Sequence, residues 1–349
     1  MNPRSVLAAC AALALLGMQA LPATAQEPTR IRFTLDWKIS GPHAFYYWAK
    51  QKGYFAAEGL DVTIDQGEGS AATVTRVMTG AYDAGFGDIN AIMQTAAAKP
   101  GEQPVMVYLV YNRAPYAVIA KADGPIRTLK DLEGRTVSAP AGSATLRLLP
   151  PLGAKNGFDA SKVKILNAAP NLIEQMLVQG QADAIAQFSV TSYMNFVAMK
   201  RDPEKDFRWF MYSDLGLDLY ANGVMVSQKL LAEKPAAVRG LVKVINRAVM
   251  DVAADPAAAV ALVAGLEPLI NVDIETRRLV YTIKSLMISP ETARLGIGDL
   301  DDGRLAASIA TVAEAYALDK RPDPRAVFVR DFLPPKAERD IAAAAAKAK

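Results

Sequence analysis

LDWKISGPHAFYYW, residues 35–48, sets the architecture of the chain, because it links a predicted strand to a predicted helix through a loop of polar and aromatic side chains. The strand covers residues 30–35, and the helix starts at Pro42, a residue well suited to a first turn. The loop carries three residues with chemistry to offer a ligand: Asp36, Trp37 and His43. Ligands of open α/β sheets bind beside such loops, at the carboxyl ends of the strands. We therefore predict that this stretch forms one wall of a small-molecule cleft.

Strands and helices continue to alternate after this stretch, which predicts an α/β protein. Helices separate four expected strands, over residues 30–35, 60–64, 82–86 and 105–111. A second alternating set begins at Tyr116 and runs to a strand over 182–187. We expect two lobes, each a mixed, mostly parallel sheet flanked by helices.

The rest of the chain is almost entirely helical, and we expect these C-terminal helices to pack on the first lobe. They are predicted over residues 229–254, 256–264, 273–286, 301–316 and 324–332. The expected segments are 26–114 (first part of lobe 1), 115–218 (lobe 2), 219–335 (second, mainly helical part of lobe 1) and 336–349 (a frayed tail). Crossings near 112–115 and 213–222 would give a hinged clamshell.

The first 25 residues are typical of a secretory signal peptide. Arg4 precedes an apolar run over 6–16, and Ala-Thr-Ala follows at 23–25. The alternative is a buried N-terminal helix. No later stretch is long and charge-free enough to cross a bilayer. We expect an exported, periplasmic protein that does not span the membrane and is a monomer.

Composition excludes several kinds of function. The only cysteine, Cys10, lies in the expected leader, so an exported chain would have no disulfide, cysteine nucleophile or thiolate metal site. With a single histidine there is no nucleophile–base pair or metal cluster at a recognisable spacing. The formal charge is +3 and basic residues are scattered, which argues against a nucleic-acid partner. We predict no catalytic residue, no metal and no cofactor.

Several motifs also resemble a known family. In chain order they are LDW at 35–37, His43, KGYFAAEGLDV at 52–62, GEGS at 67–70, YDAGFG at 82–87 and LKDLEGRTV at 129–137. Together they resemble periplasmic solute-binding proteins of ABC importers, in the branch that binds thiamine-precursor pyrimidines, nitrate and alkanesulfonates. The resemblance implies a type II periplasmic-binding fold. It also implies that two lobes close on the ligand and then dock on an inner-membrane ABC permease.

The first lobe offers an aromatic wall. Trp37 could stack on a flat heterocycle, as the matching tryptophan does in the pyrimidine-binding relatives, or it could fill space between helix and sheet. His43 matches a family histidine and either donates to ligand or caps the loop. Phe45, Tyr46, Tyr47 and Trp48 cannot all face one side of a helix, and we expect Tyr46 or Tyr47 at the cleft.

The GEGS motif places small residues and a hydroxyl at a helix N-terminus, where free backbone amides favour an acceptor or an anion. Glu68, Gly69 and Ser70 are therefore candidate ligand residues. An inward Glu68 would repel nitrate or sulfonate, and nothing basic sits in the same loop. We therefore favour a neutral or amine-bearing ligand, an argument that fails if Glu68 points outward.

Other candidates follow later strands. Asp88 and Asn90 open one helix, and Ser143 and Thr145 open another, although capping is the common role of such residues. Phe188, Tyr193 and Asn195 follow the strand over 182–187. Some pyrimidine binders of the family carry an acidic residue near here, where this chain has Asn195.

Four functions compete at this point. The first is a receptor that delivers an aromatic or heterocyclic molecule, such as a thiamine-precursor pyrimidine, to an ABC permease. Its variants are a binder of small anions such as nitrate or sulfonate and a sensor subunit that presents its ligand to another protein. The last is an enzyme like the pyrimidine-precursor synthases, which share the fold but use cysteine-rich and lysine/histidine chemistry.

Overall fold

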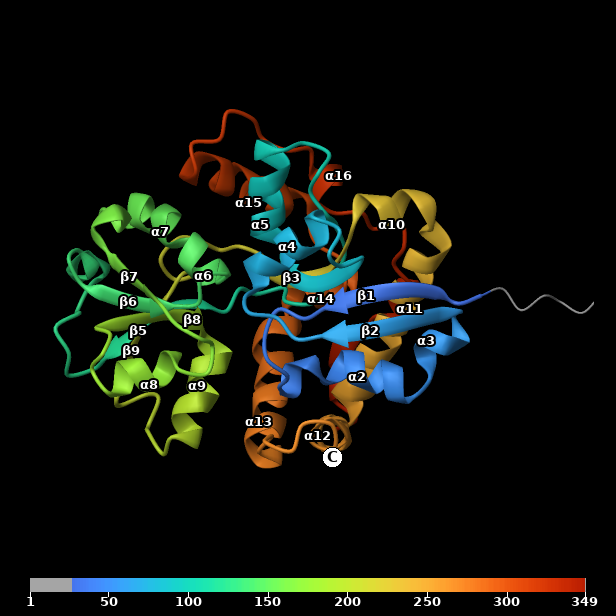
Figure 1. Ribbon diagram of the computed structural model, residues 1–349, viewed down its shortest axis with the longest axis horizontal. Coiled ribbons are helices and arrows are strands. Elements are labelled where there is room, and N and C mark those ends of the chain that lie inside the picture. The colour runs from blue at the N-terminus through green and yellow to red at the C-terminus, as the bar shows by residue number, and fades with distance from the viewer. Residues whose placement is uncertain (1–26, 349) are drawn as a thin grey trace, which may run out of the picture.

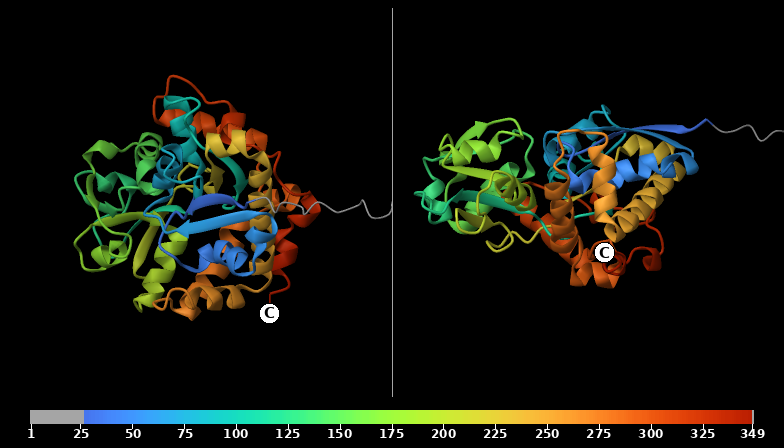
Figure 2. Two further views of the ribbon diagram at one scale, coloured as in Figure 1. Left: turned by 45° about the vertical axis from the view of Figure 1, so that its right-hand side comes forward. Right: turned by 90° about the horizontal axis from the view of Figure 1, so that it is seen from below.

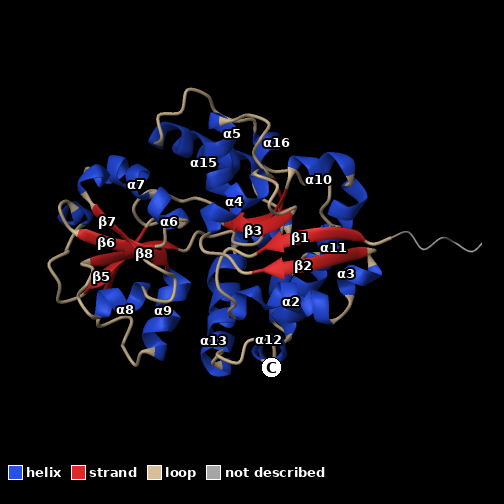
Figure 3. Ribbon diagram, in the orientation of Figure 1, coloured by secondary structure: helices blue, strands red, loops and turns tan. Residues whose placement is uncertain are grey.

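The computed structural model describes residues 27–348 and contains two five-stranded sheets. The expected signal peptide, residues 1–25, lies outside the described residues. Each sheet belongs to its own lobe, and helices flank both sheets (Figure 1, Figure 3). The two lobes remain distinct when the molecule is seen from below (Figure 2). This is the two-lobed α/β architecture that the alternation predicts.

The first sheet has the strand order β2-β1-β3-β10-β4. Its strands are β1 (Thr29–Thr34), β2 (Leu60–Asp65), β3 (Ala84–Asp88), β4 (Val105–Leu109) and β10 (Asn222–Val226). β1 runs parallel to β2 and β3, whereas β10 is antiparallel to β3 and β4. All residues of β4 are buried, as its nearly all-apolar sequence predicts.

The second sheet has the order β7-β6-β8-β5-β9. Its strands are β5 (Tyr116–Lys121), β6 (Thr136–Ala139), β7 (Lys164–Asn167), β8 (Ala184–Phe188) and β9 (Phe207–Met211). β6 runs parallel to β7 and β8, and β5 is antiparallel to β8 and β9. The chain crosses between the sheets over residues 110–115 and 212–221. The first strands after these crossings are β5 and β10. Each is antiparallel to a strand of the parallel part of its sheet.

Helices connect the parallel strands within each lobe. In the first lobe they are η1 (Gly41–His43), α2 (Ala44–Gln51), α3 (Tyr54–Ala57), α4 (Ser70–Met78) and α5 (Ile89–Ala98). In the second lobe they are η2 (Leu129–Leu132), α6 (Ala144–Arg147), α7 (Leu149–Asn156), η3 (Ala160–Lys162), α8 (Ile173–Val178) and α9 (Ser189–Ala198). Proline occupies the first turn of α7, so the helix expected after Ser143 is two helices.

The C-terminal part is helical, as predicted, but differs in detail. Its elements are α10 (Gln228–Glu233), α11 (Pro235–Ala254), α12 (Pro256–Ala264), α13 (Val272–Thr282), the π-turn η4 (Ile283–Met287), α14 (Pro290–Leu295), α15 (Asp302–Ala315), α16 (Pro324–Val327), η5 (Lys336–Glu338) and α17 (Ile341–Ala345). The single helix expected over 229–254 breaks before Pro235, which has no amide hydrogen to continue it. The helix expected over 324–332 ends at Val327, because Phe328 bridges to Met106 of β4.

The prediction of a frayed tail over 336–349 is wrong for the described residues. Ile341 and Ala344 are buried, and α17 packs against α11. The two apolar contacts of this short helix lie one turn apart, which is too brief a stripe to recognise among many alanines.

The C-terminal helices also touch the second lobe. α11 and α12 pack against α2 of the first lobe, as expected. α13, however, packs against α9, and α15 packs against α7. These two contacts join the lobes outside the crossings. No helix among residues 27–348 is long and apolar enough to cross a membrane.

Candidate functional site

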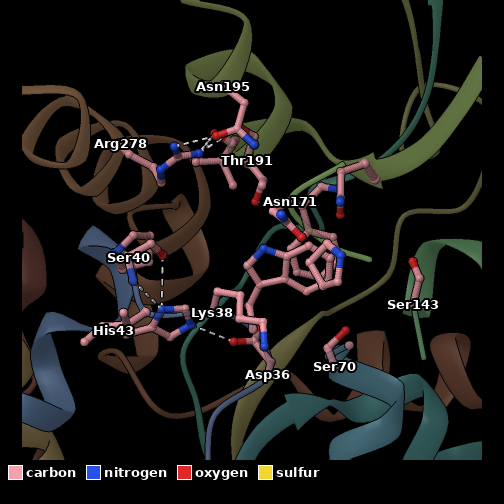
Figure 4. A pocket seen from close by; sticks show the side chains of 18 of the residues that line it. Asp36, Lys38, Ser40, His43, Ser70, Ser143, Asn171, Thr191, Asn195 and Arg278 are labelled. Atoms are coloured by element: carbon pink, nitrogen blue, oxygen red, sulfur yellow. Dashed lines mark hydrogen bonds and ion pairs between the residues drawn. The ribbon is translucent and has the colours of Figure 1, made fainter. Parts of the chain in front are cut away.

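A cleft of about 200 Å³ lies between the two lobes (Figure 4). The first lobe lines it with residues of the 36–43 loop and with Gly69 and Ser70, and the crossing contributes Tyr111. The second lobe supplies Ser143, Pro170, Asn171, Gln187, Phe188, Val190, Thr191 and Asn195. α13 adds Glu275 and Arg278. The site is therefore built from both lobes and from a helix remote in sequence.

Asp36 and His43 line the cleft but bind each other. The backbone N–H of Ser40 donates to His43 Nδ1 at 3.1 Å, so Nε2 is the nitrogen that donates to Asp36 Oδ1 at 2.8 Å. Asn222 Nδ2 donates to the other carboxylate oxygen at 2.8 Å. These bonds hold the loop in shape and leave the two side chains little capacity for a ligand.

Trp37 lines the cleft and is half-buried. Backbone bonds hold its loop against the GEGS loop: Gly67 N donates to Trp37 O at 3.0 Å, and Gly69 N donates to Asp36 O at 2.8 Å. A Cβ at Gly67 would lie 2.1 Å from the carbonyl oxygen of Leu35. Glycine is therefore required for this close approach.

Three of the first-lobe candidates do not line the cleft. Tyr46 is buried in the core beside Phe33 and Phe86, and burial raises its pKa well above the ordinary value. Tyr47 is half-buried, packed against the core. The Glu68 side chain is 65% exposed and lies 3.9 Å from Lys38. Glu68 therefore points away from the cleft and gives no reason to prefer a neutral ligand over an anion.

Asp88 and Asn90 also lie away from the cleft. Asp88 caps α5 by accepting from the backbone N–H groups of Asn90 and Ala91, and it accepts from Tyr116 Oη at 2.7 Å. Burial raises the pKa of Asp88, while these hydrogen bonds act in the opposite direction. Asn90 Nδ2 donates to Tyr220 O at 2.8 Å. Tyr116 directly follows the first crossing and Tyr220 lies in the second, so Asp88 and Asn90 tie the two crossings together.

Some of the second-lobe candidates line the cleft and others do not. Ser143 caps α6 and lines the cleft, whereas Thr145 is fully buried beside it. Phe188 lines the cleft, 5.6 Å from the ring of Tyr116. Asn195 lines the cleft, but its side-chain oxygen accepts from Arg278.

Tyr193 turns toward α13 instead of the cleft. Its ring stacks on Tyr281 at 5.7 Å with an interplanar angle of 17°, and its hydroxyl donates to Glu204. Tyr193 is thus part of the contact between α9 and α13.

Gln187 is a cleft residue that sequence reasoning missed. It is 3% exposed, and its Oε1 accepts from the backbone N–H of Phe188 at 3.0 Å. This bond fixes the amide orientation, because a backbone N–H can only donate. Nε2 then has no partner among the described residues. The sequence signal that could have identified Gln187 is its position as a polar residue at the end of an apolar strand.

Glu275 and Arg278 were also missed, because nothing in the sequence connects α13 with the 36–43 loop. Arg278 Nε and Nη2 donate to Glu275, and Nη1 donates to Thr191 O at 2.7 Å. Nη2 also donates to Asn195 Oδ1 at 2.8 Å. The guanidinium group is therefore occupied by protein acceptors. Lys38, the other cation lining the cleft, is exposed beside Glu68.

No group of three or more histidine, cysteine, aspartate and glutamate side chains that could hold a metal ion occurs in the part of the chain that the structure describes. The lining of the cleft combines aromatic and apolar side chains with hydroxyl and amide groups, and its buried charged groups are hydrogen-bonded within the protein.

Several known proteins are similar to this chain in sequence. A riboflavin-binding protein, RibY of Chloroflexus aurantiacus, is 27% identical over 322 residues, which cover 90% of each chain. A formylaminopyrimidine-binding protein of Halalkalibacterium halodurans is 26% identical over 211 residues, covering 60% of this chain and 61% of that protein. The 4-amino-5-hydroxymethyl-2-methylpyrimidine phosphate synthase of Aspergillus parasiticus is 24% identical over 293 residues, covering 78% and 84%.

Among solved structures, the alkanesulfonate-binding protein SsuA from Xanthomonas axonopodis pv. citri, bound to MOPS, superimposes with a TM-score of 0.65 at 18% identity. The match covers 87% of this chain and 99% of that one, and it shows the periplasmic-binding fold alone. The profile of the family described as NMT1/THI5 like matches residues 40–259. The chain belongs to this NMT1/THI5-like family.

Proposed function

We propose that the protein is an exported receptor that captures a neutral, flat heterocycle between its lobes and delivers it to an ABC permease. The observation that carries this proposal is the cleft itself: Trp37 from one lobe and Phe188 from the other line it, and its buried charged groups already have hydrogen-bond partners in the protein. Aromatic rings bind flat rings by stacking. The riboflavin-binding and pyrimidine-binding relatives have ligands of this class.

The size of the cleft supports an organic ligand. A cavity needs roughly 10–15 Å³ of volume, measured in the same way, to hold one water molecule. A cleft of about 200 Å³ therefore has room for many heavy atoms, far more than one nitrate ion requires. Gln187 Nε2, which has no hydrogen-bond partner among residues 27–348, would donate to a carbonyl oxygen or ring nitrogen of the ligand.

Binding of a small anion such as a sulfonate is the second candidate. The N-terminus of α4 supports it, because Gly69 and Ser70 line the cleft and helix amides attract negative charge. Against it, Arg278 already donates to Glu275, Thr191 and Asn195. A buried anion needs a compensating cation, and the Arg278 guanidinium group already donates to protein acceptors.

Catalysis is the third candidate, because several relatives are pyrimidine phosphate synthases. The chain has one cysteine, Cys10, and one histidine, His43, which already donates to Asp36. A nucleophile with its base would need partners that this cleft does not bring together. Binding without chemical change therefore remains the proposal.

Equilibrium dialysis tests the proposal. The protein is dialysed against an extract of bacterial metabolites, and the compounds enriched on the protein side are identified by mass spectrometry. We expect enrichment of a neutral heterocycle such as a flavin or a pyrimidine. Enrichment of sulfonates or inorganic anions alone would favour the second candidate.

A further inference from the structure

We propose that Arg278 is a positioning residue that holds the two lobes together over the cleft. The inference deepens the proposed function and rests on it, because it assigns the contact that a captured ligand would have to lock. The residue lies on α13, a C-terminal helix packed against α9 of the second lobe. The proposal follows from what each of its nitrogen atoms touches.

The guanidinium group bridges the lobes. On its own side, Glu275 accepts from Nε at 2.9 Å, and Glu275 Oε2 also accepts from the backbone N–H of Gly41 at 2.7 Å. Gly41 belongs to η1, at the end of the loop that carries Trp37. On the other side, Thr191 O and the Asn195 side chain of α9 accept from Nη1 and Nη2. Arg278 therefore connects the wall of the first lobe to the first helix after β8 (Figure 4).

Burial makes these bonds important. The Arg278 side chain is 6% exposed and the Glu275 side chain 12%. Opening the lobes would remove the acceptors on α9 and return the guanidinium group to water. Charge-assisted hydrogen bonds are stronger than neutral ones, so their loss shifts an opening equilibrium measurably.

A second contact joins the lobes at the opposite end of the cleft. Gly69 and Gly142 meet backbone to backbone, and Ala72 N donates to Gly142 O at 3.3 Å. A Cβ on Gly69 would lie 2.1 Å from Gly142 O. Ser70 and Ser143, the neighbours of these glycines, lie at this end, and Arg278 with Asn195 at the other (Figure 4). The cleft is thus enclosed between two points of contact, and Arg278 supplies the charged one.

Distances between spin labels test the proposal without any ligand. Cysteines are introduced by Asp61→Cys on β2 and Lys164→Cys on β7, two exposed positions in different lobes, together with Cys10→Ser. Double electron–electron resonance then compares the parent protein with Arg278→Ala. Arg277→Ala is the matched control, because Arg277 is the exposed neighbour on the same helix and pairs with Asp273.

We expect Arg278→Ala to raise the ratio of long to short label distances roughly tenfold, and Arg277→Ala to leave it unchanged. Asn195→Ala, which removes an acceptor from the second lobe, should act in the same direction and serves if Arg278→Ala does not fold. Equal distance distributions in the Arg278→Ala or Asn195→Ala protein and the control would overturn the proposal.

Ligand titration separates this inference from the proposed function. With riboflavin and a thiamine-precursor pyrimidine as probes, closure by Arg278 predicts a similar loss of affinity in Arg278→Ala for any probe that the parent binds. If the parent binds neither probe but the label distances change as expected, the heterocycle assignment is wrong and the proposed role of Arg278 holds. If the probes bind and the distances do not change, the proposed role of Arg278 is wrong and the proposed function holds.

Discussion

Trp37 and Gln187 are the two residues on which recognition of a flat ligand depends in this account. Trp37 offers a ring face at the cleft, and Gln187 offers an amide hydrogen that no described residue accepts. The Trp37 ring would supply contact area, and the Gln187 amide would orient the ligand. The two roles are separable because one is stacking and the other is a hydrogen bond.

Replacing Trp37 by alanine should weaken binding roughly 10- to 100-fold, the range measured for stacking of a base on an aromatic side chain. The melting temperature should change little, because Trp37 is only half-buried. Fluorescence titration with riboflavin measures the loss, and Trp48→Ala, on α2 away from the cleft, is the control. Unchanged affinity in Trp37→Ala would mean that the indole only fills space.

Replacing Gln187 by methionine should lower affinity by roughly 3- to 10-fold, the value of one neutral hydrogen bond. Methionine keeps the length of the side chain but cannot donate. Isothermal calorimetry should show the loss mainly in enthalpy for a ligand with a ring carbonyl. An equal affinity of variant and parent would place the ligand away from β8.

The sequence identified the residues whose chemistry stands out and missed those that depend on packing. Trp37, His43, Ser143 and Phe188 were predicted from their positions after strands, and all line the cleft. Tyr46 was predicted there and lies in the core, since helical spacing alone does not say which face meets the sheet. Ligand contact by any of these residues stays a prediction.

Two elements control how closely the lobes meet: the glycine loops that start α4 and α6. Gly142 faces Ala72 so closely that a Cβ at Gly142 would lie 2.6 Å from the Cβ of Ala72. The loops can touch only because both contribute glycine. Local sequence indicated a helix N-terminus at each loop but not that the two loops would meet.

A valine at Gly142 should therefore hold the lobes apart. We expect roughly tenfold weaker riboflavin binding, in line with the cost of overpacking, and little change in the melting temperature, because the strain is relieved by opening. Gly265→Ala, at the end of α12, is the control substitution. Parent-like affinity in Gly142→Val would show that binding does not need this contact.

The packing of α8 on α9 predicts a pH dependence. Ser192 Oγ donates to the buried carboxylate of Glu174 at 2.7 Å, yet burial raises the pKa of Glu174 above its ordinary value. The folded protein therefore keeps this proton to higher pH than the unfolded chain does. Its stability is full below the ordinary carboxyl pKa and falls as pH rises through the raised one.

Glu174→Gln should remove that loss. The free energy of unfolding of the variant should match that of the parent at about pH 3 and exceed it at about pH 8, because glutamine cannot ionise. Urea unfolding at both pH values measures the difference, with the exposed Glu314→Gln as control. The same difference at both pH values would contradict the assignment to Glu174.

The whole molecule is held together behind the cleft by a polar network at the hinge. Glu291 Oε1 accepts from Asn112 Nδ2 at 2.9 Å and from Tyr220 Oη at 2.6 Å. Arg304 Nη1 donates to Glu291 Oε2 at 3.3 Å. Asn112 and Tyr220 belong to the two crossings, so one carboxylate of α14 ties both hinge segments to the C-terminal helices.

Local alternation of strands and helices was enough to predict two lobes and where the chain crosses between them. It could not predict that α13 returns to the cleft, because Arg278 and Thr191 are separated by 87 residues and meet only through packing. The same limit explains why α15 was not expected on α7. Beside this contact Tyr316, the residue after α15, donates to the carbonyl oxygen of Arg147 at the end of α6.

Calorimetric titration of the parent protein with riboflavin, a thiamine-precursor pyrimidine, nitrate and taurine tests whether this cleft is a receptor for neutral heterocycles. We expect saturable binding of riboflavin or of the pyrimidine, and no binding of nitrate or taurine. Saturable binding of nitrate or taurine, with no heat from the heterocycles, would contradict it.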